Sequence, residues 1–571
     1  MDGGSVSIAL ANKLNFLTSE TPRRKSLAAG GASRSAKCSC QRPFLRIPPF
    51  PGARVRAFTP TDRGDVGPDL INLIRQMKVG GPYWAAQPEL PARYLLVTDV
   101  AALSAADREG DPVVLWTHGA DATVQAADFA INGECDPWHM LAGATKLVTS
   151  AADELAVIGL ILGVPVELLD ARCGSLTQLT DDPRDILLDV LSAGYENPFT
   201  GTRMSVTETA ELCGFWRTLV DSNRDVAGAI GFAFWKQRHV APLLWGGTHA
   251  VQFVRSGRST ASGRPVAIWR SKITAEQVRL LEKQDSPLIE VEDGFLRSQG
   301  LGADCVPPLS IVVDRLGAHF DPSRPSELEL ILQNHDFEEG ALARAGRLRH
   351  AIVEARLGKY ERARVGFVRR RTPGRRHILV PGQVEDDRAV QSGGCGLTSN
   401  LDLLARVKAR EPDAYLLYKP HPDVLAGHRP GAIADKECLA QADEIVRDQP
   451  ISSLIEMVDE VHVNTSLAGF EALLRDKPVT TYGVPFYSGW GLTRDLGPVP
   501  ARRTRRRTLE ELIAATMLIY PRYLDPVTGL PCPAEVLVDR LSMDEQRRLN
   551  PIVFMRRLQG RLLRRFRGLA A

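Results

Sequence analysis

Short apolar segments rich in β-branched residues alternate with helical stretches through most of this chain, and this alternation constrains the fold more than any other feature. Turn residues follow each segment, and most then lead into a helical pattern. Such alternation predicts α/β units on parallel sheets with right-handed crossovers. The predicted strands lie within residues 93–100, 111–119, 144–151, 163–170, 264–271, 286–294, 376–383, 413–422, 458–466 and 476–484.

Length and composition limit the class of protein. At 571 residues the chain is long enough for three or four domains, or for two large ones. Its 44% hydrophobic and 24% charged residues are ordinary for a folded protein and exclude a mostly disordered, collagen-like or disulfide-stapled chain. The net charge of +3 argues against a polycation, and the basic run at 502–507 lacks the aromatic residues typical of nucleic-acid binders. We therefore expect no nucleic-acid partner.

Cysteine usage and hydropathy indicate the compartment. The nine cysteines are dispersed along the chain, which is typical of reduced thiols in a cytoplasmic protein. No segment reaches the roughly 18 apolar residues that a membrane-spanning helix needs. We expect a protein that is soluble or peripheral to a membrane.

Two stretches of the chain resemble each other. Residues 137–166 align with residues 450–479 without a gap, and the motif Tyr-x-x-Pro-x-Thr-Gly follows each copy, at Tyr195 and at Tyr523. Chance similarity between two βαβ units is the alternative, but two matches in the same order favour a duplication. In the first copy, Asp153 and Ile158 stand where the second has Ser466 and Glu471. Because an apolar side chain cannot hydrogen-bond a ligand, we expect the first copy to be degenerate.

Polar residues follow several predicted strands, at the sheet edge where ligands bind in open α/β sheets. Glu292 and Asp293 end one strand, Gly294 allows a tight turn, and Arg297 is close enough to hold a carboxylate ionised. A carboxylate in this position suits a nucleophile or a general base. The alternative is a pair of acids that stabilise a helix N-terminus.

A second polar motif, Lys-Pro-His-Pro, follows another strand. Its prolines restrict the backbone, so that Lys419 and His421 can point the same way toward a phosphate-like anion. The alternative is a rigid surface turn with a solvated lysine.

In a third motif, hydroxyl residues precede a predicted helix. Thr465 and Ser466 follow a strand and open the helix, whose free N–H groups would bind an anion. Alternatively, Ser466 is an ordinary N-cap. Glu471, in the same helix, would accept hydrogen bonds from a ribose diol or be a solvated surface residue.

Two further segments supply candidate substrate contacts. Aromatic residues in the loop 482–493, including Trp490, would stack on a sugar or base, or would pack the loop. Gln383 and three acids, Glu385, Asp386 and Asp387, end a different strand. No histidine or acid beyond these three is placed to complete a metal-binding set, so we expect polar substrate contacts and no metal.

The segments EDGFLRSQGLGADCVPPLSIVVD, VPGQVEDD, YKPHPDV and NTSLAGFEALLRDKPVTTYGVPFYSGWGLT together resemble the capsule polysaccharide biosynthesis family, and within it the KpsC-like retaining β-Kdo glycosyltransferases. The resemblance spans about residues 260–530. It implies an α/β, GT-B-like fold with two Rossmann-like halves, here preceded by a degenerate partial copy of the module. It also implies CMP-Kdo as donor substrate, with no other cofactor.

The resemblance assigns roles to the candidate residues. It implies that Asp293 is the nucleophile of a retaining double displacement, with Glu292 as its neighbour. The residues implied to bind the CMP-sugar are Lys419, His421, Thr465, Ser466 and Glu471. The residues implied to contact substrate are Arg297, Gln383, Glu385 and Trp490. Arg297 would bind the Kdo carboxylate or tune Asp293, and Glu385 and Asp386 are candidates for the acid/base.

The chain departs from the family in its first module, because nothing like EDGFLRS or KPHP precedes residue 240. We therefore expect one active site. The alternative function is that of a non-catalytic capsule polysaccharide assembly or export protein. The expected divisions are a disordered lead-in (1–60), a truncated first module (61–240), an acceptor-side half (241–375), a CMP-sugar-binding half (376–535) and a basic helical tail (536–571).

The tail carries a further prediction. Residues 555–567 contain six arginines and no acid, with leucine and phenylalanine at helical spacing. This pattern favours an amphipathic helix on an anionic membrane surface, and a packed terminal helix or a disordered tail is the alternative. The expected location is the cytoplasm, peripheral to the inner membrane. The expected partners there are a lipid-linked saccharide acceptor and other capsule assembly proteins.

Overall fold

The computed structural model of the chain describes residues 43–61, 69–104, 110–117, 127–150, 153–170, 175–180, 194–255, 263–298, 306–358 and 373–543, with isolated positions between 182 and 191. The chain forms two compact units. Within the described residues, the N-terminal unit comprises residues up to 224 together with 245–250, and the C-terminal unit comprises 225–244 and 251–543. The predicted membrane-binding segment 555–567 lies outside the described residues.

The C-terminal unit contains two sheets, and the first is seven-stranded with the order β10-β9-β11-β12-β13-β20-β21. The strands β10, β9, β11 and β12 are parallel, and the remaining pairings are antiparallel. The strands are β9 (Gly228–Ile230), β10 (Phe253–Val254), β11 (Val266–Ile268), β12 (Leu288–Asp293), β13 (Ser310–Asp314), β20 (Pro521–Leu524) and β21 (Pro531–Cys532). The helices of this half are α7 (Phe234–Val240), α8 (Ala275–Glu282), α9 (Glu327–Asn334), α10 (Glu339–Glu354), α17 (Leu509–Ile513) and α18 (Ala534–Ser542).

The second sheet of this unit is six-stranded and wholly parallel, with the order β16-β15-β14-β17-β18-β19. Its strands are β14 (His377–Pro381), β15 (Tyr415–Lys419), β16 (Glu444–Ile445), β17 (Glu460–Val463), β18 (Val479–Thr481) and β19 (Arg494–Asp495). The accompanying helices are α11 (Arg388–Gly393), α12 (Asn400–Arg410), α13 (Pro422–Leu425), α14 (Asp435–Gln441), α15 (Ile451–Met457) and α16 (Leu467–Leu473).

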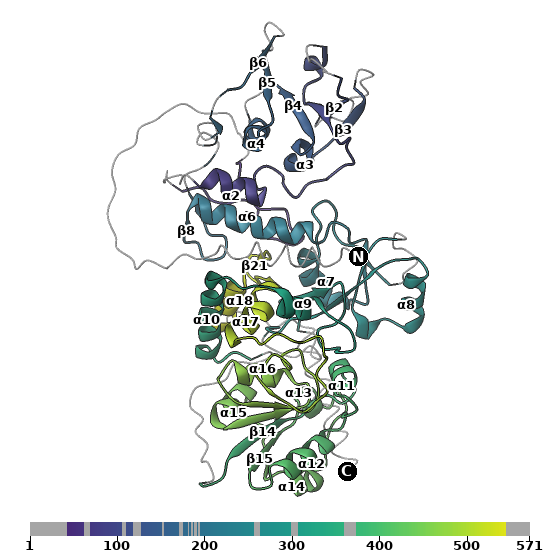
Figure 1. The fold of residues 1–571 in the computed structure, drawn as a ribbon, viewed down its shortest axis with the longest axis vertical. Helices are drawn as coiled ribbons and strands as arrows, with labels where there is room; N and C mark the ends of the chain where they lie inside the picture. Colours follow the sequence, from purple (N-terminus) through teal and green to yellow (C-terminus); the bar gives the residue numbers. More distant parts are fainter. Residues whose placement is uncertain are drawn as a thin grey trace, which may run out of the picture. The chain divides into compact units, whose positions relative to one another are not determined.

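Helices cover both faces of this parallel sheet. α12 contacts α14, and α15 contacts α16, on opposite sides of the sheet (Figure 1). Every residue of β14 and β17 is consequently buried, and this includes the polar residues His377, Glu460 and His462. The predicted α/β architecture with two Rossmann-like halves is confirmed.

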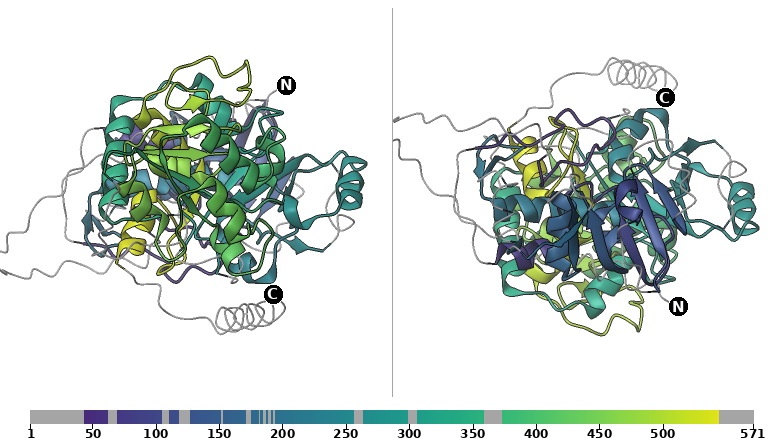
Figure 2. Two further views of the ribbon diagram at one scale, coloured as in Figure 1. Left: turned by 90° about the horizontal axis from the view of Figure 1, so that it is seen from below. Right: turned by 90° about the horizontal axis from the view of Figure 1, so that it is seen from above.

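The N-terminal unit contains a six-stranded sheet with the order β3-β2-β1-β4-β5-β6, drawn in purple and blue in Figure 2. In chain order this is the same arrangement as the second sheet of the C-terminal unit. The strands are β1 (Tyr94–Val97), β2 (Val113–Thr117), β3 (Phe129–Asn132), β4 (Ala144–Thr149), β5 (Val166–Leu169) and β6 (Leu176–Gln178). The segments around them are α2 (Leu70–Met77), η1 (Val100–Ser104), α3 (Pro137–Leu141), α4 (Glu154–Leu162), β7 (Tyr195–Glu196), β8 (Arg203–Met204) and α6 (Val206–Asp221).

The shared strand order is consistent with the predicted internal repeat. β4, α4 and β5 correspond to β17, α16 and β18 in the aligned stretches. One difference is that β6 pairs antiparallel with β5, whereas β19 pairs parallel with β18. The repeat therefore covers a whole Rossmann-like half.

The second match in the repeat is a hairpin with the same register in both units. Tyr195 pairs with Met204 as Tyr523 pairs with Cys532. The turn is also the same: Gly201 N donates to the Asn197 carbonyl at 2.8 Å, and Gly529 N donates to the Asp525 carbonyl at 2.9 Å. These identical local bonds support duplication over chance similarity.

Residues 43–60 correct the expected disordered lead-in. Phe44, Leu45, Phe50 and Phe58 are buried, and Glu196 N donates to the Thr59 carbonyl at 2.8 Å. Apolar burial of this extent stabilises an ordered segment, so the prediction of disorder is wrong for residues 43–60.

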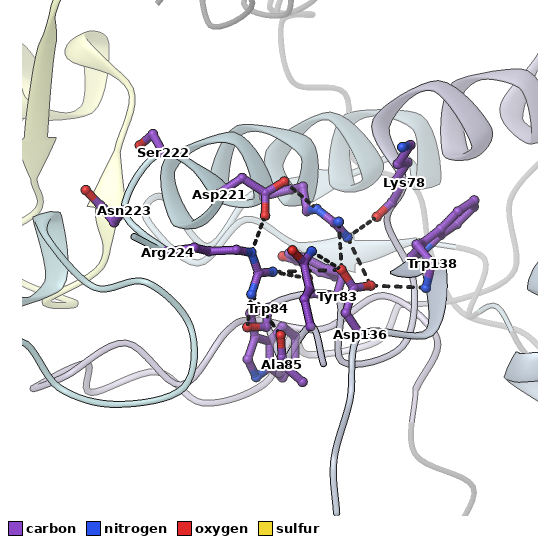
Figure 3. Close-up of polar contacts among 12 residues, drawn as sticks. Lys78, Tyr83, Trp84, Ala85, Asp136, Trp138, Asp221, Ser222, Asn223 and Arg224 are labelled. Atoms are coloured by element: carbon purple, nitrogen blue, oxygen red, sulfur yellow. Dashed lines mark hydrogen bonds and ion pairs between the residues drawn. The ribbon is translucent and has the colours of Figure 1, made fainter. Parts of the chain in front are cut away.

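Buried charges in the N-terminal unit form one paired network (Figure 3). Asp136 is fully buried and accepts hydrogen bonds from Arg217 at 2.7 Å and from Gln87 at 2.8 Å. Arg224 donates to Asp221 at 2.7 Å and to the Ala85 carbonyl at 2.8 Å. Because buried charges are tolerated when they are paired and hydrogen-bonded, this network is a structural link between α6 and the loops before α3.

Within the part of the chain that the structure describes, no helix is both long enough and apolar enough to span a membrane.

Candidate active site

Asp293 is the last residue of β12, and cations contact both of its carboxylate oxygens. Arg297 Nε donates to Oδ2 at 2.8 Å, and Lys236 Nζ lies 3.4 Å from Oδ1. The carboxylate side chain is 24% exposed. Two adjacent positive charges favour the ionised form, so the site holds a partly accessible carboxylate anion.

The chain turns sharply after Asp293 without starting a helix, so the alternative of a helix N-terminus is wrong. Gly294 N donates to the Ser310 carbonyl at 3.0 Å, and a Cβ atom at position 294 would collide with Ser310 Oγ. Glycine is therefore required by the close approach of β13.

Arg297 faces into the protein. Its side chain has no exposed surface, and besides Asp293 it donates to Ser298 Oγ at 3.0 Å and to the Val306 carbonyl at 2.6 Å. This geometry favours the tuning of Asp293 over direct contact with a substrate carboxylate.

Lys236 was not predicted from the sequence. It lies in α7, which follows β9, and its ammonium nitrogen lies 3.2 Å from the centroid of the Trp269 ring. Burial lowers the pKa of Lys236 to about 8, an effect that Asp293 opposes. The sequence offers one indication of Lys236, which is its position just after β9. That strand is parallel to β11, and parallel strands end at the same edge of the sheet.

Glu292 points to the opposite side of β12 from Asp293, as alternate strand residues do. Arg388, the first residue of α11, contacts it at 3.1 Å and contacts Glu290 at 3.0 Å. Burial raises the pKa of Glu292 to about 7, although Arg388 acts to lower it. Glu292 therefore joins the two halves of the C-terminal unit through Arg388, and it titrates near neutral pH.

In the second half, Gln383 and Thr465 lie together at the carboxyl ends of β14 and β17. Thr465 N donates to Gln383 Oε1 at 2.9 Å, and Gln383 Nε2 donates to Thr465 Oγ1 at 3.0 Å. Asn400 fixes the Gln383 backbone with two bonds of 2.8 Å. The expectation that these strand ends converge is confirmed.

Lys419 and His421 follow β15. Lys419 is buried, and its Nζ donates to the Arg447 carbonyl at 3.4 Å, so it is not a solvated surface lysine. His421 is the N-cap of α13, and its Nδ1 accepts from Asp423 N at 3.1 Å. That bond leaves the ring proton on Nε2 in the neutral form.

Ser466 and Glu471 lie in or beside α16. Ser466 Oγ accepts from Ala468 N at 3.2 Å, so the N-cap alternative holds for this hydroxyl. Glu471 is buried rather than solvated. At Gly469 a Cβ atom would collide with the Tyr487 hydroxyl, which packs against this helix.

The remaining candidates have structural partners. Glu385 Oε1 accepts from Asn400 N at 2.8 Å and thereby caps α12, while Asp386 pairs with Arg429 at 2.7 Å. Trp490 is fully buried, and its Nε1 donates to the Phe486 carbonyl at 2.9 Å. For Trp490 the loop-packing alternative therefore holds in this structure.

Among the residues that the structure describes, no His, Cys, Asp and Glu side chains cluster in a metal-binding arrangement.

The N-terminal unit retains part of the motif around Asp293. Phe44-Leu45-Arg46 matches Phe295-Leu296-Arg297 in sequence. Each tripeptide precedes a segment that pairs with the hairpin of its unit: Pro60 forms a bridge to Tyr195, and Ser310 of β13 pairs with Tyr523. The expectation that nothing like EDGFLRS precedes residue 240 is thus wrong for its FLR portion. Gln41 and Arg42 stand at the positions of Glu292 and Asp293.

The donor-side positions of this copy have changed as well. Thr117 ends β2 where Lys419 ends β15, and Ile158 lies at the position of Glu471. The N-terminal copy therefore lacks both the carboxylates and the basic residue of the C-terminal unit.

Comparison with known proteins identifies the class to which this fold and site belong. The model of the family described as "Capsule polysaccharide biosynthesis protein" matches residues 265–523, which include β11, β12 and β13 of the first sheet and the whole second sheet of the C-terminal unit. The chain belongs to the capsule polysaccharide biosynthesis family, and its two Rossmann-like halves form a GT-B-like fold.

Within that family the chain is similar to KpsC and LipA. It is 33% identical to the β Kdo 2,7 transferase of Thermosulfurimonas dismutans KpsC, with 56% of this chain and 99% of that chain covered and a TM-score of 0.46. It is 31% identical to the β Kdo 2,4 transferase of the same protein, with 55% of this chain and 98% of that chain covered and a TM-score of 0.49. The capsule polysaccharide modification protein LipA of Neisseria meningitidis is 37% identical over 389 residues, 66% of this chain and 55% of LipA. The chain thus spans about half the length of the curated relatives it matches.

Proposed function

We propose that the chain is a retaining glycosyltransferase that transfers Kdo from CMP-Kdo to a lipid-linked saccharide acceptor in capsule polysaccharide synthesis. The observation that carries this proposal is the Asp293 carboxylate, held between Lys236 and Arg297 at the carboxyl end of β12. Relatives whose solved structures are titled β Kdo transferases support the choice of sugar.

Retention follows from two successive displacements at the anomeric carbon. In the first, an Asp293 oxygen forms a bond to that carbon, and the bond to the donor phosphate breaks with its electron pair leaving on CMP. In the second, an acceptor hydroxyl attacks the same carbon, the bond to Asp293 breaks, and the hydroxyl proton passes to a base. Glu385 and Asp386 are the proposed candidates for that base.

The donor would bind at the carboxyl ends of β14, β15 and β17. Lys419 and His421 would stabilise the single phosphate of CMP, together with the N–H groups beside Thr465 and Ser466. Glu471 would accept hydrogen bonds from the ribose. CMP is a good leaving group, so the reaction as proposed needs no metal ion.

Because the proposed acceptor is lipid-linked, we expect the transfer reaction to take place at the cytoplasmic face of the membrane. Residues 555–567 would hold the protein at an anionic surface there.

The test is to incubate the purified full chain with freshly generated CMP-Kdo and a short Kdo-terminated lipid acceptor. We expect an acceptor product one Kdo longer, with the β configuration. Binding of CMP without any product would contradict the proposal and favour a non-catalytic role in capsule assembly.

A further inference from the structure

The donor sugar of the proposed reaction carries an unusual charge. Kdo is an ulosonic acid, so its carboxylate is attached to the anomeric carbon itself. Attack by Asp293 on that carbon brings two carboxylates within a few ångströms, and their repulsion opposes the reaction. A cation near both groups would offset it.

Arg297 does not supply that cation. Its guanidinium is fully buried, and its donors contact Asp293, Ser298 Oγ and the Val306 carbonyl. Arg388 is also engaged, because it bridges Glu290 and Glu292.

Lys236 has the required position. Its Nζ lies 3.4 Å from Asp293 Oδ1, whereas Arg297 Nε donates to Oδ2. A near-attack geometry places the anomeric carbon about 3–3.5 Å from the attacking oxygen, with the sugar carboxylate one bond further. Both carboxylates can therefore lie within ion-pair distance of Lys236, about 4 Å.

The surroundings of Lys236 hold the ammonium group in place and leave it partly accessible. Nζ lies 3.2 Å from the centroid of the Trp269 ring and 5.3 Å from that of Trp235, both within cation–π range. The side chain is 10% exposed, whereas that of Arg297 is not exposed at all. Phe234, two residues away, is 71% exposed, so this end of α7 faces solvent.

We propose that Lys236 binds the carboxylate on the anomeric carbon of the donor and thereby makes the site specific for ulosonic acids. This inference rests on the proposed function. When the bond from Asp293 to the anomeric carbon forms and CMP leaves with its electron pair, Asp293 becomes an uncharged ester. Lys236 then pairs with the sugar carboxylate alone, so its interaction with the sugar strengthens as the reaction proceeds. No proton moves to or from Lys236 in this step.

The experiment compares ligands with and without the carboxylate charge. Binding of Kdo and of its C1 methyl ester is measured by NMR titration in the presence of saturating CMP, for the wild-type chain, Lys236→Met, Lys236→Gln and Lys236→Arg. Met keeps an unbranched stem over Trp269, so that at least one uncharged variant retains the local packing. Lys272→Gln, an exposed lysine of the same half, is the matched control.

We expect the wild-type chain and the Lys272 variant to prefer Kdo over its ester by at least tenfold. The Met and Gln variants should lose this preference to within twofold, while CMP affinity and melting temperature stay unchanged. Lys236→Arg should retain part of the preference.

The two possible failures are distinguishable. If the wild-type chain makes product and the uncharged variants still prefer Kdo tenfold, the role of Lys236 is wrong and the proposed function stands. If the wild-type chain makes no product and shows no preference for Kdo, the proposed function fails and this inference fails with it.

Discussion

The ammonium nitrogen of Lys236 lies 3.4 Å from Asp293 Oδ1, although the two residues are 57 positions apart in the chain. α7 follows β9 and Asp293 ends β12, and both strands belong to the parallel part of one sheet. The sheet therefore places a cation and a carboxylate from separate segments at the same edge. The proposed chemistry depends on this pair.

Replacement of Asp293 by Asn should abolish transfer. An amide has no anionic oxygen to attack the anomeric carbon, so we expect the rate to fall by roughly 10⁴-fold or more. CMP affinity should remain within a factor of two, because the proposed nucleotide contacts lie in the other half. Product formation is measured by chromatography and CMP binding by calorimetry. Asp413→Asn, at an exposed aspartate with no proposed role, is the matched surface control. Turnover within tenfold of wild type in Asp293→Asn would exclude Asp293 as nucleophile.

His421→Ala and Glu471→Gln should each weaken CMP binding. Loss of one hydrogen bond to a charged group costs about 1.5–3 kcal/mol, which corresponds to an affinity at least tenfold lower. Calorimetric titration with CMP measures this directly. Ile158→Val changes the position equivalent to Glu471 in the N-terminal copy and should leave CMP affinity unchanged. Wild-type affinity in both C-terminal variants would place the nucleotide elsewhere.

The rate of transfer should fall as pH rises through about 8, where Lys236 loses its proton. Burial and Arg297 lower the pKa of Lys236, and Asp293 and Glu292 raise it. The alkaline limb of the profile of rate against pH therefore reports on this group of charges. Lys236→Arg should move the limb upward by at least one pH unit, because arginine keeps its charge. The measurement is kcat/KM against pH. An unchanged limb in the Arg variant would assign it to another group.

Glu292 should make the chain less stable as pH rises. Its pKa is about 7 in the folded protein and about 4.5 when exposed, so folding favours its protonated form. The folded state therefore binds more protons between pH 4.5 and 7, and the free energy of unfolding falls with rising pH in this window. The contribution is on the order of 3 kcal/mol from the size of this shift.

Chemical denaturation of wild type and Glu292→Gln at several pH values measures this effect. The variant should lose less stability than wild type between pH 5 and 7.5. Parallel curves for the two proteins would contradict the prediction.

A chain that ends at Asn550 should lose binding to anionic vesicles while it keeps activity on a soluble acceptor. Each arginine near an anionic surface contributes about 1 kcal/mol, screened by salt. Vesicle sedimentation at low and high salt measures the effect for the full and shortened chains. Equal sedimentation of the two at low salt would show that the tail is not the membrane contact.

The sequence by itself determined the α/β class and the strand-end motifs, and it favoured a duplication. Alternating apolar runs identify parallel strands, and parallel strands end at one edge, so Gln383 and Thr465 could be expected to meet there. Asp293 could be singled out because two acids and a glycine follow an apolar run. These conclusions depend on local pattern and on a general property of parallel sheets.

The tertiary structure alone decided which side chains meet and which are buried. Lys236 reaches Asp293 because β9 lies two strands from β12, and Arg388 joins Glu292 because the two halves pack in one unit. Trp490 and Arg297 carry groups that suit a ligand, yet packing buries both. Residues 43–60 have no sustained apolar period, but their aromatic side chains are covered by the N-terminal unit. Burial and contact between distant segments depend on the packing of the whole chain, which no local pattern specifies.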